Sequence, residues 1–231
     1  MIGIIGAMSV EIEALASRMT EAHTVKAGMD EFRVGRLFGA EAVLAVCGCG
    51  KVNAALCAQQ MILLFHPEWV LNIGVAGGAD PSLGIGDMVI GTTAVQHDMD
   101  TTPMGDPPGY VSGIGVIEFP LDAALRARLK KAAAAVDGVR VVEGVIATGD
   151  QFVNRPEVTR RIRETFHAAA VEMEGAAVAH ACYQLGVPCG VLRSISDGAN
   201  SDSGMDFAAF TALASAHAQR VTELLLTEEK Q

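Results

Sequence analysis

Four acidic side chains stand directly after apolar, strand-like runs, and they are the residues of this sequence best placed to do chemistry. They follow three separate runs and are Glu11, Glu172, Glu174 and Asp197. A single carboxylate at such a place is equally well explained by favourable charge at a helix start. Acidic residues at three strand ends together favour general acid–base chemistry on a neutral or cationic small molecule.

Two glycine-rich turns raise the question of phosphate binding, and both miss the established spacings. Gly3–Met8 lacks the full G-x-G-x-x-G pattern of a dinucleotide site. Gly48–Lys51 resembles half of a phosphate loop, but Ala45 and Val52 stand where that motif needs Gly and Ser or Thr. We interpret Gly48–Lys51 as a turn that begins a helix, whose backbone N–H groups could still meet a ligand.

Neither a metal centre nor a nucleophilic Ser or Cys is indicated. His97, Asp98 and Asp100 share one loop, but three polar residues there seldom suffice for a metal, and His180 with Cys182 has no zinc spacing. The sequence has no G-x-S-x-G elbow, and its cysteines lie in apolar contexts without a nearby histidine. We therefore expect no metal and no other cofactor.

Composition narrows the class of partner. The 231 residues carry a net charge of −10 without a basic stripe, which argues against nucleic acid as a polymeric partner. The longest uncharged run, Gly175–Leu192, is interpreted as a helix leading into a buried strand, so no membrane association is expected. Met1–Val10 lacks the basic start of a secretory signal, and five cysteines without a CxxC pair suit a reducing compartment. We expect a cytoplasmic protein with a small-molecule ligand.

The elements that must position these residues alternate along the whole chain. The patterns predict strands at Ile2–Ile5, Glu41–Val46, Val70–Ile73, Asp87–Thr92, Val141–Ile146, Ala168–Val171 and Val187–Ile195. Helices are predicted from about Ser9, as a cap, and at 51–65, Leu121–Val136, Arg155–Phe166, Glu174–Leu185 and Phe207–Leu226. This alternation predicts one α/β domain over residues 1–231, a three-layer α/β/α arrangement around a central, twisted, mostly parallel sheet. The aperiodic stretch Asp98–Gly115 is expected to be a functional or interface loop.

Five segments, in order, carry a family resemblance. They are Gly3–Met8 with Glu11, the glycine turn Gly74–Gly78, Thr148–Val153, Val171–Glu174 and Arg193–Asp197. Together they resemble the bacterial 5′-methylthioadenosine/S-adenosylhomocysteine nucleosidases of the purine nucleoside phosphorylase superfamily, over essentially the whole chain. The resemblance implies a nucleoside phosphorylase-like fold, hydrolysis of an N-glycosidic bond to adenine and a 5-thioribose product, and a place in methionine salvage.

The resemblance also implies roles for individual residues. Glu11 would be the base that activates water, and Asp197 the acid that protonates adenine N7. Glu174 would bind the ribose hydroxyls above Met173. The remaining substrate-binding residues would stack on adenine, make backbone contacts, support the water or the acid, or line the 5′ and ribose pockets. They are Met8, Val75, Ala76, Gly77, Phe152, Val153, Glu172, Arg193, Ser196 and Phe207.

Some positions depart from the family pattern and leave the substrate open. Val75 stands where a Ser is frequent, and Cys49 where a bulkier aliphatic residue is common. The family resemblance suggests a homodimer whose partner loop, here with Thr101 and Met104, reaches the neighbouring pocket. Methylthioadenosine, S-adenosylhomocysteine, 5′-deoxyadenosine and aminofutalosine all stay open as substrates. A phosphorolytic purine nucleoside phosphorylase and a non-catalytic nucleoside sensor are the competing interpretations.

Overall fold

The computed structural model describes residues 1–198 and 207–227, with the side chains from 207 to 210 outside the description. The strands are β1 (Ile2–Gly6), β2 (Met19–Ala27), β3 (Asp30–Leu37), β4 (Ala40–Val46), β5 (Val70–Gly78), β6 (Met88–Gln96), β7 (Glu118–Pro120), β8 (Val141–Thr148), β9 (Ala168–Glu172) and β10 (Cys189–Gly198). The helices are α1 (Ser9–Ser17), α2 (Lys51–Phe65), α3 (Ala123–Ala133), α4 (Pro156–Phe166), α5 (Gly175–Leu185) and α6 (Phe207–Thr227), with a 3-10 turn at Thr102–Met104. Every strand and helix that the sequence predicted has a counterpart in the structure, whereas β2, β3 and β7 were not predicted.

These strands form one 10-stranded sheet in the order β10-β6-β8-β9-β5-β1-β4-β3-β2, with β7 added on β6. Because β10 also pairs with β5, the strands β5, β9, β8, β6 and β10 close into a ring. The pairs of β1 with β4 and β5, of β10 with β5, and of β8 with β6 and β9 are parallel. The β2–β3–β4 hairpins and the pairs β10–β6, β5–β9 and β6–β7 are antiparallel, so the sheet is more mixed than the sequence predicted.

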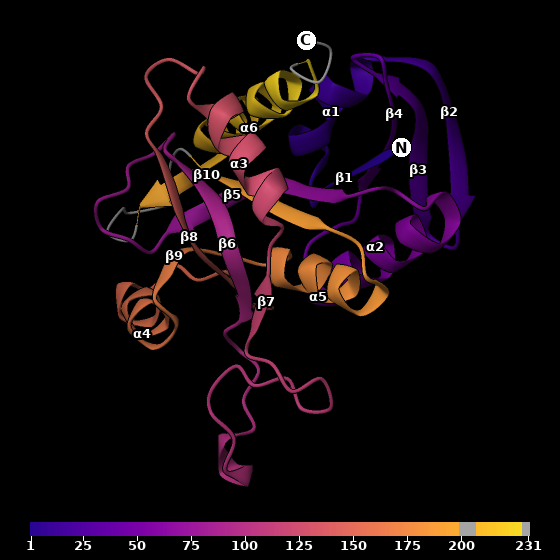
Figure 1. Ribbon diagram of the computed structural model, residues 1–231. Helices are drawn as coiled ribbons and strands as arrows, with labels where there is room; N and C mark the ends of the chain where they lie inside the picture. Colours follow the sequence, from indigo (N-terminus) through magenta and orange to yellow (C-terminus); the bar gives the residue numbers. More distant parts are fainter. Residues whose placement is uncertain (199–206, 228–231) are drawn as a thin grey trace.

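Helices cover both faces of the sheet, as the α/β prediction requires (Figure 1). Helices α2 and α5 pack together on one face, while α1 and α3 pack on α6 on the other. A separate apolar cluster fills the space on each face, one centred on Met61, Ala177 and Val191, the other on Leu15, Leu129 and Leu225. Among the described residues, no helix has the length and apolarity needed to cross a bilayer.

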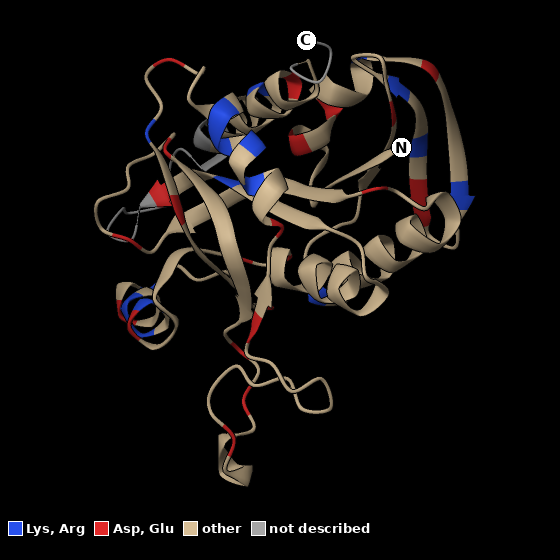
Figure 2. Ribbon diagram, viewed as in Figure 1, with Lys and Arg blue, Asp and Glu red and all other residues tan. Residues whose placement is uncertain are grey.

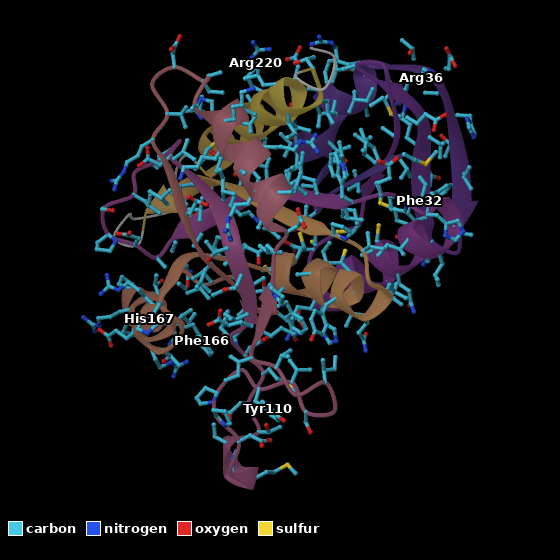
Figure 3. All side chains as sticks on the ribbon, viewed as in Figure 1. Phe32, Arg36, Tyr110, Phe166, His167 and Arg220 are labelled. Carbon is cyan, nitrogen blue, oxygen red and sulfur yellow. The ribbon has the colours of Figure 1, made fainter. Side chains whose placement is uncertain are left out.

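Two local predictions at the N-terminal end were wrong. Ser9 does not cap α1: it is the first helical residue, and Met8 occupies the N-cap position. The hairpin of β2 and β3 was missed, because most side chains of β2 are exposed and give no alternating pattern. Phe32 of this hairpin is nevertheless fully buried and packs on Phe65 of α2 with ring centroids 5.2 Å apart (Figure 3).

The glycine-rich segment Gly74–Gly78 also differs from its prediction as a turn. It continues strand β5, which pairs there with β10 and, at its last two residues, with β9. Its glycines leave room for side chains from α1 and β10. A glycine-rich strand of this kind has the same sequence pattern as a turn, so the two could not be distinguished.

The segment between β6 and β7 projects from the body of the molecule (Figure 1). It carries Tyr110 (Figure 3), and the 3-10 turn that ends at Met104 lies at its tip (Figure 1). The side chain of Met104 is 82% exposed. Charged residues elsewhere on the surface are mixed in sign, for example along α4 (Figure 2). Glu143 likewise pairs with Arg126 and Lys130.

Candidate functional site

A cavity of about 210 Å³ lies at the carboxyl ends of β1, β5, β9 and β10. Its lining contains all four predicted carboxylates and comprises Ala7, Met8, Glu11, Cys49, Val75, Ala76, Gly77, Gln151, Phe152, Val153, Val171, Glu172, Met173, Glu174, Ser196 and Asp197. Ligands of open α/β sheets bind at this end of the strands. The structure therefore brings together residues that the sequence predicted from five separate segments.

Glu11 reaches the cavity from the first turn of α1. Its Oε2 accepts hydrogen bonds from the N–H groups of Ala7 and Met8 at 2.8 and 2.9 Å, and its Oε1 accepts from Val75 N at 3.0 Å. Burial raises the pKa of Glu11, against the opposing effects of the Arg193 charge and these backbone N–H groups. The result is a fixed carboxylate with more basic character than an exposed one.

The close approach of Glu11 to β5 depends on a missing side chain. A Cβ at Gly74 would lie 2.5 Å from Glu11 Oε1, closer than any real contact allows. Gly77 has a weaker effect of the same kind on Asp197, because a Cβ there would lie 3.2 Å from Asp197 Oδ2, a tight contact that a small shift of the carboxylate would relieve. The glycines of β5 thus let two acidic side chains from different elements lie against one strand.

Beneath the cavity, Arg193 is 1% exposed and joins three strands. Its guanidinium forms an ion pair with Glu172 and donates to the Asn72 side chain, to the Asn72 carbonyl at 3.2 Å and to the Leu192 carbonyl at 3.1 Å. With Nε also donating to Glu172 at 3.1 Å, all five guanidinium N–H groups are taken up within the described chain. Arg193 therefore does not line the cavity and acts on it through its charge and through Glu172.

Glu172 fixes the start of α5. It accepts from Gly175 N at 2.7 Å, from Glu174 N at 3.1 Å and from the Thr148 hydroxyl, in addition to Arg193. An anion at a helix N-terminus meets unpaired N–H groups and the positive end of the helix dipole. This side chain is thus an anchor as well as part of the cavity wall.

Glu174 is buried next to this anchor, and within the described part of the chain its carboxylate accepts one hydrogen bond. Its Oε1 accepts from Gly50 N at 2.8 Å. Burial, reinforced by the negative charge of Glu172, raises the pKa of Glu174 to about 7, although the Gly50 N–H and Arg193 oppose the shift. Its carboxyl is therefore poised to gain or lose a proton near neutral pH.

Asp197 projects into the cavity from an irregularity in β10. The pairing with β5 shifts between Ile195 and Asp197, which leaves Ser196 as an extra residue of the kind that re-aims side chains. The Ser196 hydroxyl donates to Asp197 Oδ1 at 2.9 Å. Burial raises the pKa of Asp197 despite this hydrogen bond. A raised pKa is what a general acid needs.

The other predicted residues fall into three groups. Met8, Met173 and Val153 are half-buried in the cavity wall, and Phe152 lies at its edge with 57% of its surface exposed. Phe207 begins α6, but its side chain lies outside the described residues. Thr101 and Met104 lie on the projecting segment and are not among the residues that line this chain's own cavity.

Sequence reasoning missed several contributors. Asn72 and Thr148 are fully buried polar residues of β5 and β8. Asn72 was not singled out, and Thr148 was named only as the start of a family-like segment, without a role. Gly50 belongs to the turn that was expected to offer N–H groups to a ligand, and its N–H instead meets Glu174. The Lys51 amine, which a phosphate-binding interpretation would need, pairs with Asp98 at 2.6 Å.

Comparison with known proteins agrees with this arrangement. The model of the phosphorylase superfamily matches residues 1–227. A 5′-methylthioadenosine/S-adenosylhomocysteine nucleosidase of Geobacillus kaustophilus is 44% identical over 230 residues, covering 99% of this chain and 97% of the relative. The nucleosidase of Neisseria meningitidis in complex with methylthio-immucillin-A is 36% identical with a TM-score of 0.92, over 98% of both chains. A futalosine hydrolase of Helicobacter pylori also has 36% identity and a TM-score of 0.92, over 98% of this chain and 97% of that one.

Proposed function

This chain belongs to the phosphorylase superfamily and, within it, to the 5′-methylthioadenosine/S-adenosylhomocysteine nucleosidases, and from that premise we propose its reaction. It hydrolyses the N-glycosidic bond of 5′-thio-substituted adenosines, releasing adenine and a 5-thioribose. The observation that carries the proposal is the meeting of Glu11, Glu174 and Asp197 in one cavity, each with a raised pKa.

Cleavage of the N-glycosidic bond requires stabilisation of opposite charges on its two sides. As the bond breaks, the ribose develops positive charge while the leaving base gains electrons, so a carboxylate near the sugar and a proton donor near the base both stabilise the transition state. Glu11 takes a proton from the attacking water, and Asp197 gives one to adenine N7. The pairing corresponds to the acid and base of an inverting glycosidase.

The remaining lining residues position the nucleoside. Glu174 accepts hydrogen bonds from the ribose hydroxyls, with Met173 and Met8 packed against the sugar. Phe152 stacks on adenine and the Val153 backbone reads its edge. Val75, Ala76 and Gly77 offer backbone along the sugar side.

Arg193 and Ser196 act on the nucleoside indirectly, through the acidic side chains that they contact or influence. Because the guanidinium N–H groups are taken up by Glu172, Asn72 and Leu192, Arg193 supports the water only indirectly, by its charge on Glu11. Ser196 orients the Asp197 carboxyl through its hydrogen bond. Phe207 is assigned to the 5′ pocket by family resemblance alone.

Purified protein with a panel of 5′-substituted adenosines, including aminofutalosine, tests the reaction by adenine release. Glu11→Gln should lower kcat by about 100-fold or more while nucleoside affinity is kept, and Asp197→Asn should remove the alkaline limb of the pH profile. Glu13→Gln on the exposed side of the same helix is the matched control. Unchanged rates in Glu11→Gln would contradict the assignment of the base, and tight adenosine binding without turnover in the wild type would favour a sensor.

Two alternatives are separated by the same assay. A strict requirement for phosphate would show phosphorolysis, which needs cations. Among the described residues, the cavity lining holds no Lys or Arg, and the nearby Lys51 and Arg193 are already paired. Preference for aminofutalosine would place the enzyme closer to the Helicobacter pylori hydrolase.

For assembly, we propose one domain over residues 1–231 that forms a cytoplasmic homodimer. Thr101 and Met104 on the projecting segment would then complete the partner's 5′ pocket. The exposed Met104 supports this assignment, because a large apolar side chain at the tip of a projecting loop is suited to a protein contact. Light scattering of the wild type and of Met104→Asp tests it; a monomeric wild type would contradict it.

A further inference from the structure

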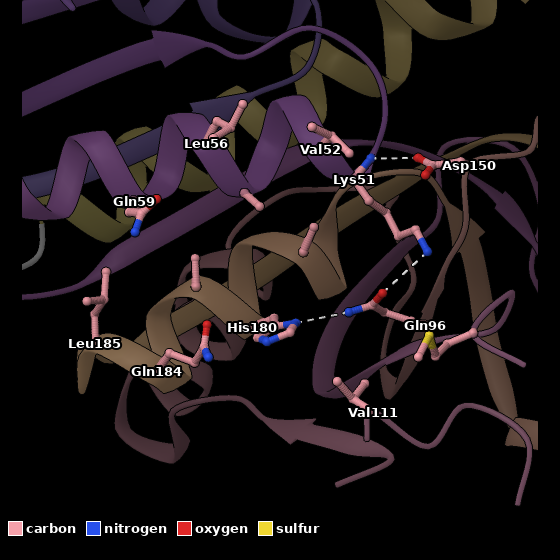
Figure 4. A pocket seen from close by; sticks show the side chains of 14 residues that line it. Lys51, Val52, Leu56, Gln59, Gln96, Val111, Asp150, His180, Gln184 and Leu185 are labelled. Atoms are coloured by element: carbon pink, nitrogen blue, oxygen red, sulfur yellow. Dashed lines mark hydrogen bonds between the residues drawn. The ribbon is translucent and has the colours of Figure 1, made fainter. Parts of the chain in front are cut away.

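Three segments beside the cavity are tied together by a ring of polar contacts. Lys51 Nζ pairs with Asp98 Oδ1 at 2.6 Å, and Asp98 Oδ2 accepts from Asp150 N at 2.8 Å. Asp150 Oδ1 accepts from Lys51 N at 2.7 Å (Figure 4). We call Lys51, Asp98 and Asp150 the clasp. They come from the start of α2 and from just after the ends of β6 and β8, so the clasp joins segments 47, 52 and 99 residues apart in the chain.

The clasp is more buried than an ordinary surface ion pair. The side chains of Lys51 and Asp98 are 17% and 16% exposed, whereas those of the Lys26–Glu31 pair, also 2.6 Å long, are 72% and 60% exposed. Removing two charges from water costs free energy that their attraction barely offsets, so such a pair contributes little to stability by itself. Its geometric effect on the attached backbone is the more specific consequence.

Each end of the clasp adjoins residues of the cavity. Gly50, directly before Lys51, is the residue whose N–H binds Glu174, and Cys49 lines the cavity. Directly after Asp150 come the lining residues 151–153, which include the aromatic ring assigned to adenine. The hydrogen bonds of Lys51 N to Asp150 and of Gly50 N to Glu174 lie on the two sides of the Gly50 Cα, where a Cβ would come within 3.1 Å of Asp150 Oδ1. The contact between Lys51 N and Asp150 therefore fixes one of the two peptide units that meet at Gly50.

The Lys51 amine faces a second, larger cavity of about 580 Å³ between α2 and α5, but it is not a free cation there. It also donates to Gln96 Oε1 at 3.3 Å, and Gln96 in turn contacts His180 (Figure 4). An anion in this cavity would have to displace Asp98. The contacts therefore favour a role in holding backbone over a role in binding a ligand.

We propose that Lys51 and Asp98 are positioning residues for the nucleoside site: through Asp150 they hold the Gly50 N–H on Glu174 and the 151–153 segment over the cavity. The proposal rests on the nucleosidase function for the identity of the ligand. Since Asp98 also begins the projecting segment, the clasp links that segment to the site.

Lys51→Met removes the charge and keeps an unbranched side chain that is one atom shorter, and Lys26→Met is the matched control at an exposed pair of equal distance. We expect Lys51→Met to raise KM and the adenine dissociation constant about 10-fold while kcat changes less than 3-fold. The acidic limb of kcat/KM should move to higher pH, because Glu174 loses a hydrogen bond that favours its ionised form. Lys26→Met should behave as the wild type.

Asp98→Asn provides a second variant of nearly unchanged shape. If the two residues act through one contact, the double variant Lys51→Met/Asp98→Asn should be no worse than the poorer single variant. Additive losses, or an unmoved KM and pH limb in both folded single variants, would overturn the proposal. Hydrogen exchange at amides 50–51 and 150–153 without ligand reports the clasp independently of turnover: faster exchange is expected in both variants, and unchanged exchange would refute it. Absence of adenine release in the wild type would instead refute the nucleosidase function.

Discussion

Replacing Glu174 by Gln should make the ligand-free protein more stable at alkaline pH while it abolishes efficient turnover. Burial and the charge of Glu172 raise the folded-state pKa of Glu174 from 4.5 to about 7. An acid whose folded pKa is raised binds its proton more tightly in the native state, so native stability falls as pH rises between the two values. Glutamine keeps an oxygen for the Gly50 N–H and removes the titration.

The size of the effect follows from the same shift. Two and a half pKa units correspond to about 3 kcal/mol at ~1.36 kcal/mol per unit. The stability gained by Glu174→Gln over the wild type should therefore grow from under about 1 kcal/mol at pH 5 to about 3 kcal/mol at pH 8. For a domain of this size that difference corresponds to a rise of roughly 6–12 °C in Tm.

Urea unfolding at pH 5 and pH 8, at one protein concentration, measures this difference. Glu13→Gln is the control, since it makes the same chemical change on an exposed side chain. A pH-independent difference between Glu174→Gln and the wild type would refute the reasoning, as would a loss of stability at pH 8. A gain in stability with undiminished turnover would support the raised pKa of Glu174 but would contradict its assignment to ribose binding.

Three further outcomes follow from the same geometry. Gly74→Ala should lower kcat about 100-fold by displacing the base carboxylate, measured by adenine release, with Gly84→Ala as a control whose Cβ meets no atom closer than 3.9 Å. Asn72→Leu should destabilise the fold by about 2–4 kcal/mol in chemical denaturation, because Arg193 and a backbone carbonyl lose buried partners. The wild-type kcat/KM should fall as pH drops below about 7, where Glu174 becomes protonated; a flat profile down to pH 5 would contradict this.

The predictable parts of the fold are the elements whose buried residues give a clear hydrophobic pattern in the sequence. Helix α2 begins and ends where its pattern indicated, and the uncharged run from Gly175 does resolve into α5 followed by β10. The β2–β3 hairpin has no such signal, because its docking depends on few side chains such as Phe32. The closed ring of strands depends on the pairing of β10 with β5, a contact that no local pattern encodes.

For the site, residue type and position after a strand were enough to find the acidic residues. The way they are held was not predictable. Asn72 and Thr148 become important only because β5, β8 and β10 bring them against Arg193 and Glu172 in three dimensions. The bulge at Ser196 is equally invisible, since it exists only relative to the register of the neighbouring strand.

The glycines of β5 and Arg193, the only buried cation among the described residues, explain how so many carboxyl groups share a small space. Missing side chains at Gly74 and Gly77 let Glu11 and Asp197 approach, while Arg193 offsets part of the negative charge from below. Burial raises the pKa of Asp197 and, together with the negative charge of Glu172, raises the pKa of Glu174 to about 7. A sugar that develops positive charge during bond cleavage is attracted by the remaining negative charge of these carboxylates. The empty site therefore carries excess negative charge, and it stabilises the positively charged transition state more than it stabilises the neutral substrate.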